Sequence, residues 1–198
     1  MMTARPPAPA ATGFGQAFEL AQSSIFRLET LQSYGNSGED PALDAFRAGQ
    51  PHLVTPGKRE WTALVRDRVH GGCAMQRVHV VTEPASEYLR FELTWGYGPN
   101  AEAGEEIRII PLRQDEAWPR DVPCHDFWLF DSCDLYDIHY EPDGTWLGVE
   151  QVRDSAAIAD ARRWRDAALR LARPWADYIQ SRPDLARHVP QETVHRAS

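Results

Sequence analysis

The sequence of 198 residues has little lysine and little cysteine. Lys58 is the only lysine, and it lies in a Pro-Gly-Lys-Arg turn where we expect its amine to be solvated. Schiff-base lysines are normally desolvated to lower their pKa, so that chemistry is disfavoured. The three cysteines form no CxxC pair and predict no disulfide framework. Structural zinc prefers two close ligand pairs, so Cys124, His125 and Cys133 make a weak zinc pattern.

Long apolar runs and an excess of positive charge are also missing. No segment approaches the ~18–20 apolar residues of a membrane span, and the formal net charge is −8. A negatively charged chain is repelled by nucleic-acid phosphates and by the headgroups of an anionic membrane. Direct nucleic-acid binding and membrane association are therefore not expected. The N-terminal segment lacks the apolar core of a signal peptide, and we expect a cytoplasmic protein.

Motifs that cradle phosphates or build a nucleophile elbow do not occur in the sequence. The glycine-containing stretches GNSGED and GYGPNAEAG match neither the Walker nor the dinucleotide pattern, and there is no GxSxG. We therefore expect a protein that works without a cofactor. A chain of this length buries roughly 70% of its unfolded surface, which is enough for one domain to fold without a disulfide or a metal.

Composition divides the chain into one domain between two tails. Residues 1–24 are rich in proline and alanine and are predicted to form a disordered tail, in which residues 16–23 could form a short helix. Residues 25–180 carry the periodic apolar pattern of a single domain. Residues 181–198 are polar and are predicted to form a flexible tail.

Apolar periodicity within the domain alternates between strand and helix. Strands are predicted at residues 25–30, 75–81, 107–112, 127–130, 135–141 and 146–152. Helices are predicted after Asp40, around Trp61, from Ser86 and from Asp154, and loops at 96–104 and 113–125. Strands separated by helices require crossover connections. The sequence therefore predicts an α/β fold with a mixed parallel and antiparallel sheet flanked by helices, ending in a hairpin and a helix.

Several segments resemble a family of actinobacterial proteins known as a domain of unknown function. The resemblance is carried by RVHVVTEPASEYLRFEL (77–93), AGEEIRIIP (103–111), DFWLFD (126–131), YEPDG (140–144) and FRLETLQSYG (26–35), and it covers about residues 25–180. Members of that family are often encoded beside small helix-turn-helix regulators. The resemblance implies a regulatory setting but no particular activity.

A second similarity concerns the fold alone. A glycine before a strand, Ile-Arg at its start, and then an apolar strand that ends in an aspartate look like half of a phospholipase D-type domain. That superfamily uses a His-x-Lys pair on the corresponding strand. Here His125 is followed by Asp126 and Phe127 with no lysine nearby, so we do not expect phosphodiesterase chemistry.

Polar side chains at the ends of strands predict the ligand crevice. In open α/β sheets, ligands bind beyond the carboxyl ends of the strands. The residues that could line such a crevice are Glu29, Tyr34, Glu83, Arg90, Trp128 and Asp131. Our first hypothesis is a ligand- or partner-binding domain with a regulatory role, in which Tyr34, Glu83, Arg90 and Trp128 contact a small molecule or a protein, such as a helix-turn-helix regulator. If Glu29, Glu83, Arg90 and Asp131 converge, they would form an ion network that either holds a ligand or simply locks the core.

The second hypothesis is a small enzyme of specialised metabolism. Asp131, Glu29 and His79 would then carry out acid–base catalysis on a small-molecule substrate. A third interpretation concerns the alternating Asp137, His139 and Glu141, which share one face of a strand and could bind a metal or could simply form a solvated face. The sequence leaves open whether the protein is an enzyme.

Overall fold

The computed structural model describes residues 13–35 and 40–185, and these form a mixed α/β fold as predicted. The sheet has seven strands in the order β6-β5-β4-β1-β2-β3-β7. Strand bounds are β1 Ser24–Glu29, β2 Ala74–Glu83, β3 Glu106–Arg113, β4 Phe127–Phe130, β5 Asp134–Tyr140, β6 Trp146–Val152 and β7 Arg173–Pro174. Strands β1, β2 and β3 are mutually parallel, and the other pairings are antiparallel.

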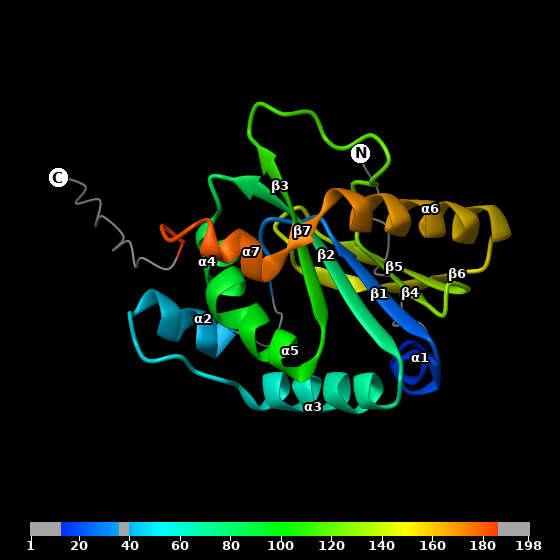
Figure 1. The fold of residues 1–198 in the computed structure, drawn as a ribbon, viewed down its shortest axis with the longest axis horizontal. Coiled ribbons are helices and arrows are strands. Elements are labelled where there is room, and N and C mark those ends of the chain that lie inside the picture. The colour runs from blue at the N-terminus through cyan, green and yellow to red at the C-terminus, as the bar shows by residue number, and fades with distance from the viewer. Residues whose placement is uncertain (1–12, 36–39, 186–198) are drawn as a thin grey trace, which may run out of the picture.

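Helices cover both faces of the sheet, and Figure 1 shows α3 and α6 on opposite sides of it. The helical segments are α1 Phe14–Leu20, α2 Asp40–Arg47, α3 Pro56–His70, α4 Glu87–Phe91, a π-helix at Glu92–Gly96, α5 Tyr97–Ala103, α6 Ser155–Leu171 and α7 Trp175–Gln180. Helix α6 packs on Phe26 and Leu28 of β1, whereas α1 and α3 pack on Ile25 and on the neighbouring strands from the other side. Among the described residues, no helix is long and apolar enough to cross a bilayer.

Local sequence signals account for most helix starts. The side chain of Thr55 accepts a hydrogen bond from the backbone N–H of Lys58 and caps α3, with Pro56 at the first helical position. Ser86 caps α4 in the same way, and Asp154 caps α6 by accepting from the N–H of Ala157. The predicted helix starts at Ser86 and Asp154 are confirmed.

Packed residues extend beyond both predicted boundaries of the domain. Within the expected N-terminal tail, residues 14–20 form α1, because Phe14 and Phe18 pack their rings against Trp128 and Phe130 on the sheet. Within the expected C-terminal tail, Leu185 is buried in the apolar cluster that α7 forms with β3. The rest of both predicted tails, residues 1–12 and 186–198, lies outside the described residues.

The predicted loop at 96–104 is wrong, since residues 97–103 form α5. Gly96, Gly98 and Gly104 suggested a loop, but the fully buried Tyr97 and Asn100 hold this turn of helix against the sheet. Gly104 ends the helix with a φ of 108°, a left-handed conformation that favours glycine. Tertiary packing therefore overrides the weak local helix propensity of three glycines.

Candidate functional site

Charged side chains lie on the central strands, on the sheet face that α3 and α5 cover. Arg27 of β1 pairs in register with Arg77 of β2 on one side and with Trp128 of β4 on the other. One pleat further along, Glu29 pairs with His79. Adjacent strands therefore bring two arginines, a glutamate and a histidine together. Because helices cover both faces of the sheet, these groups are removed from bulk water.

Glu29 is the centre of a buried ion cluster. Its Oε1 lies 2.8 Å from Nη2 of Arg27, and its Oε2 lies 2.8 Å from Nη1 of Arg77. Nε of Arg77 in turn lies 2.8 Å from Oε1 of Glu105. Burial alone would raise the pKa of Glu29, but the positive charges of Arg27 and Arg77 outweigh it and hold that pKa well below its usual range. Glu29 is therefore ionised at neutral pH.

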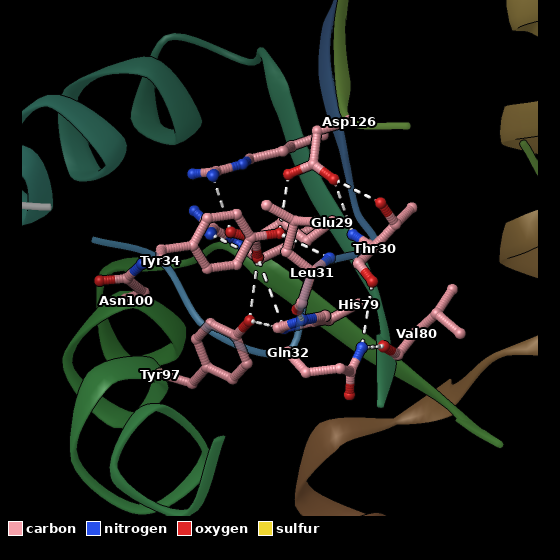
Figure 2. A network of polar contacts seen from close by, with 12 residues as sticks. Glu29, Thr30, Leu31, Gln32, Tyr34, His79, Val80, Tyr97, Asn100 and Asp126 are labelled. Atoms are coloured by element: carbon pink, nitrogen blue, oxygen red, sulfur yellow. Dashed lines mark hydrogen bonds and ion pairs between the residues drawn. The ribbon is translucent and has the colours of Figure 1, made fainter. Parts of the chain in front are cut away.

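His79 and Tyr97 extend this cluster away from the arginines. Figure 2 shows the Tyr97 side chain reaching from its helix toward Glu29 and His79, with dashed lines to both. Nε2 of His79 lies 2.8 Å from the carbonyl oxygen of Leu31 and must carry a proton to bond it. Nδ1 lies 2.6 Å from the Tyr97 hydroxyl, and Oε2 of Glu29 lies 2.9 Å from the same hydroxyl, whose single proton can go to only one of them. In the neutral form of His79 that proton goes to Nδ1. Burial lowers the pKa of His79, which favours this neutral form.

Asp126 forms a second buried polar group beside the first. Its Oδ1 accepts hydrogen bonds from the backbone N–H and the hydroxyl of Thr30, at 2.8 and 2.7 Å, and its Oδ2 accepts from the Tyr34 hydroxyl at 2.7 Å. Burial raises the pKa of Asp126 in spite of these donors. The contacts fix the loop after β1 and hold the Tyr34 ring over the sheet. Asp126 therefore positions Tyr34 rather than facing solvent.

A cavity of about 470 Å³ opens above this polar floor. Its aromatic lining comes from α1, α3, β4 and β5, and includes Phe18, Trp61, Trp128 and Tyr140. Phe18, Trp61 and Trp128 meet edge to face, with ring centroids 5.0 to 5.9 Å apart. A concave, mainly aromatic cavity with a few convergent polar groups is the typical form of a small-molecule site.

Arg27 is the charged side chain that the aromatic rings of the cavity surround. Its guanidinium carbon lies 5.1 Å from the centroid of Trp128 and 5.8 Å from that of Tyr34, both within range of a cation–π contact. The side chain is 19% exposed, in contrast to 5% for Arg77. Its Nε has no hydrogen-bond partner within the described part of the chain. That nitrogen is itself buried, so the exposed part of Arg27 is the remainder of its side chain.

The structure brings three of the predicted crevice residues into this cavity and leaves three outside it. Glu29, Tyr34 and Trp128 line the cavity. His79 lies beneath it, fully buried and bonded to Tyr97.

Asp131, Glu83 and Arg90 lie elsewhere, so the expected convergence of all six residues is wrong. Strand β4 runs antiparallel to β1, so its carboxyl end and Asp131 lie beside the start of β1, at the opposite end of the sheet from Glu29. Glu83 accepts from the Tyr178 hydroxyl at 2.8 Å and pairs with Arg182. Arg90 donates to the Asp184 carbonyl at 3.3 Å. Both bind the C-terminal segment.

The structural contacts of Asp131 are those of a backbone cap. Its Oδ1 accepts from the N–H groups of Ser23 and Ser24, and its Oδ2 accepts from the N–H of Gln22 at 2.9 Å. Burial opposes ionisation, but these donors outweigh it and lower the pKa of Asp131 to about 2. The carboxylate thus joins the end of β4 to the segment between α1 and β1.

The polar face of β5 carries ion pairs but no assembled metal site. Nε2 of His139 lies 3.1 Å from Oε2 of Glu150, and Nε2 of His125 lies 3.6 Å from Oδ1 of Asp137. No group of three potential metal ligands occurs among residues 13–35 and 40–185. Cys124 is exposed and unpaired with another cysteine.

Sequence reasoning missed Arg27, Arg77 and Trp61 as parts of the site. Arg27 and Arg77 lie in the predicted strands at 25–30 and 75–81, where they alternate with apolar residues, and Trp61 lies in a predicted helix. The order of strands and helices along the sequence could have identified the two arginines. Two strands linked through helices pair in parallel, and a parallel pair is covered on both faces, so its alternating arginines must be buried and paired.

Comparison with known proteins identifies the family. Residues 12–180 match the family model described as Domain of unknown function (DUF6879), so the chain belongs to that family. No curated protein matches the chain. The match begins before α1, in agreement with the packing of this helix against the sheet.

Proposed function

We propose that this protein binds a small molecule in the cavity above Glu29 and Arg27 and that this binding has a regulatory role in the cytoplasm. The observation that carries the proposal is the cavity itself, about 470 Å³ in volume, whose aromatic rings surround the partly exposed Arg27 side chain. A concave, mainly aromatic cavity with a few polar groups is the usual form of a small-molecule site.

The same contacts support binding over acid–base catalysis. Glu29 is the carboxylate of the cavity floor, and two arginines keep its pKa far below neutrality, so it is a poor general base. Asp131 is remote from the cavity. The close contacts of the Tyr97 hydroxyl with Glu29 and His79 are the one feature that favours the alternative, a small enzyme of specialised metabolism. Unchanged turnover of a substrate by an E29Q variant would remove Glu29 from that alternative.

The regulatory part of the proposal follows from the family resemblance. We propose an actinobacterial setting in which the domain responds to its ligand and contacts a helix-turn-helix regulator. The likeness to half of a phospholipase D-type domain is kept as a fold-level proposal without phosphodiesterase chemistry. The cheapest observation on the regulatory setting is the gene neighbourhood, because a helix-turn-helix gene favours regulation and biosynthetic genes favour the enzyme.

Binding can be tested with the uncharged fluorophore N-phenyl-1-naphthylamine, whose emission rises in an apolar cavity. We expect saturable enhancement with the wild-type protein and a loss of affinity of about tenfold or more in W128L, because a buried aromatic wall is removed. The matched control is W164L, since Trp164 contacts Phe127 and His125 on the other face of the sheet. Equal affinity in W128L and wild type would overturn the proposed site.

A further inference from the structure

We propose that Trp146 is a ligand-binding residue that forms the outer wall of the site, where its indole ring packs against a flat, apolar end of the bound molecule. This role deepens the proposed function and rests on it. Three properties of Trp146 carry it, namely the face of the sheet to which the side chain points, its exposure at the rim of the cavity and the fixed position of its backbone.

A β-bulge near the start of β6 turns Trp146 toward the cavity. Ile138 of β5 pairs with Val149 of β6. Two residues further along β5, Tyr140 pairs with Trp146, which is three residues from Val149. Paired residues point to the same face of a sheet, and Tyr140 shares a face with Ile138. Trp146 therefore shares a face with Val149, although a spacing of three places two residues on opposite faces of a regular strand.

The bulge decides which of two apolar side chains faces the cavity. Leu147 is the extra residue of β6, and in a regular ladder it would pair with Tyr140 in place of Trp146. Instead, Trp146 lines the cavity, as Tyr140 does, whereas Leu147 does not. Gly148 follows the extra residue with a φ of 143°, in the region that favours glycine. Bulges commonly re-aim a side chain beside a functional site, and this one directs a tryptophan to the cavity.

Trp146 lies at the rim of the cavity, whereas the polar groups lie on its floor. Trp146 is 47% exposed, in contrast to 5% for the Arg77 side chain. It is the single exposed aromatic residue in the part of the chain that the structure describes. Trp61 and Trp128 contact each other edge to face, but the Trp146 ring makes no ring contact with another described residue. A ligand that covers this ring would bury apolar surface that the fold leaves in water.

The backbone at Trp146 is fixed from two sides. On one side Trp146 pairs with Tyr140 of β5. Immediately before it, Thr145 forms a parallel bridge with Gly35, and the Gly35 N–H donates to the Gly144 carbonyl at 3.0 Å. A tryptophan has only two side-chain torsions to order, so contact with a ligand costs little conformational entropy. Trp146 is therefore a largely preformed wall of the site.

These positions favour a ligand that reaches from the interior of the cavity to its rim. The volume of about 470 Å³ lies within the usual range for small-molecule sites. Tyr140 lines the same side of the cavity as Trp146, and aromatic rings pack well against flat partners in offset or edge-to-face contacts. The outer end of the ligand is therefore inferred to be an aromatic or other flat apolar group.

Titration with N-phenyl-1-naphthylamine tests this role, because its two linked aromatic groups suit a site with an inner and an outer part. We expect W146A to bind the fluorophore about tenfold more weakly than the wild type, because the outer aromatic wall is lost. W146F keeps a ring and should recover most of the affinity. The matched control is L147A, which changes the neighbouring residue outside the cavity and should keep the wild-type affinity. Urea unfolding of each variant verifies that folded proteins are compared.

Fluorine-19 NMR of the protein labelled with 5-fluorotryptophan shows whether the fluorophore covers Trp146. The resonance of Trp146 is the one missing from the spectrum of W146F. In the free protein we expect its chemical shift to differ between H2O and D2O, because the ring is exposed. Saturation with N-phenyl-1-naphthylamine should remove most of that difference. A merely structural role of Trp146 would leave the difference unchanged.

The outcomes separate the role of Trp146 from the proposed function. Equal affinity of W146A and the wild type, with binding that still depends on Trp128, would overturn the role of Trp146 and leave the site intact. A solvent-dependent shift that persists at saturation would have the same meaning, as would a loss of affinity in L147A equal to that in W146A. If the fluorophore does not bind the wild type, the proposed function fails, and the role of Trp146 fails with it.

Discussion

Replacing Arg77 by methionine removes the cation on which two buried carboxylates depend. Arg77 lies 2.8 Å from both Glu29 and Glu105, and the three side chains are 5%, 5% and 1% exposed. Methionine keeps much of the apolar stem but leaves Glu105 without its cation and Glu29 with Arg27 alone. Breaking a buried ion pair by removing one partner costs about 3–5 kcal/mol. We expect R77M to lower the free energy of unfolding at pH 7 by this amount, out of a typical total of about 5–15 kcal/mol.

The loss should shrink at low pH, because the wild type and the variant respond to acid in opposite ways. In the wild type the pKa of Glu29 is lowered on folding, so its stabilising effect is present above the ordinary value of 4.5 and is lost as the pH falls below it. Without Arg77, a buried negative charge lacks its cation, and protonation removes that charge. The destabilising effect of R77M is therefore relieved as the pH falls.

Urea unfolding at pH 7 and pH 5, followed by tryptophan fluorescence and far-UV circular dichroism, measures both effects. The matched control is R163M, because Arg163 forms an exposed pair with Asp160, and its side chain is 70% exposed. Such pairs contribute about 0–1 kcal/mol. A triple variant, R77M with E29Q and E105Q, should recover part of the loss by removing the buried charges. A loss below about 1 kcal/mol in R77M, or a loss that grows on acidification to pH 5, would refute the reasoning.

Three further predictions concern single groups. D131N should lower the free energy of unfolding by about 1 kcal/mol in urea titrations at pH 7, because the carboxylate that accepts from three backbone N–H groups is lost in a partly exposed place. A variant as stable as the wild type would count against this cap. His79 should be the neutral Nε2–H tautomer at pH 7 in nitrogen-15 NMR spectra, with a pKa below 6.5; an imidazolium signal at pH 7 would contradict this. Gly144 and Gly72 share a φ of 87°, but a Cβ at Gly144 would lie 2.4 Å from the Ser33 carbonyl oxygen whereas Gly72 faces open space, so G144A should cost about 1–3 kcal/mol more than G72A. Equal losses in the two variants would show that the loop absorbs the contact.

The elements with strong local signals could be predicted from the sequence. The strand at 146–152 is observed with the predicted bounds, and the Phe-Trp-Leu-Phe strand at 127–130 is fully buried as expected. Both signals are local, since one is an alternating pattern behind a Pro-Asp-Gly turn and the other is an uninterrupted apolar run. A short helix at 16–23 was expected as an option, but the packing of α1 on the sheet and the whole of α5 could not be predicted in this way. Their positions depend on contacts of Phe18 and Tyr97 with strands distant in the sequence.

Only part of the candidate site could be predicted from the sequence, because the prediction depends on the direction in which each strand runs. Glu29 and Tyr34 follow the direction of β1, and the rule that ligands gather beyond the carboxyl ends of strands places them correctly. The same rule misplaces Asp131, because it assumes that the strand at 127–130 runs parallel to β1. It runs antiparallel, so Asp126, which precedes that strand, lies near Tyr34 instead. Strand direction depends on pairing across the sheet, which no pattern within one strand reveals.

Charged and apolar residues alternate along β1, a pattern that usually indicates one solvent-exposed face. The neighbouring strands and helices show that neither face of β1 is exposed to bulk water. Phe26 and Leu28 face α6, and Arg27 and Glu29 occupy the positions that a half-buried strand would turn to water. In a central strand with a parallel neighbour no face is wet, so each charge there must be paired, and its desolvation is not offset by hydration. An apolar pair of similar volume would stabilise the core as well or better. The presence of Arg27 in such a place, partly exposed and lining an aromatic cavity, is therefore better explained by a ligand than by stability.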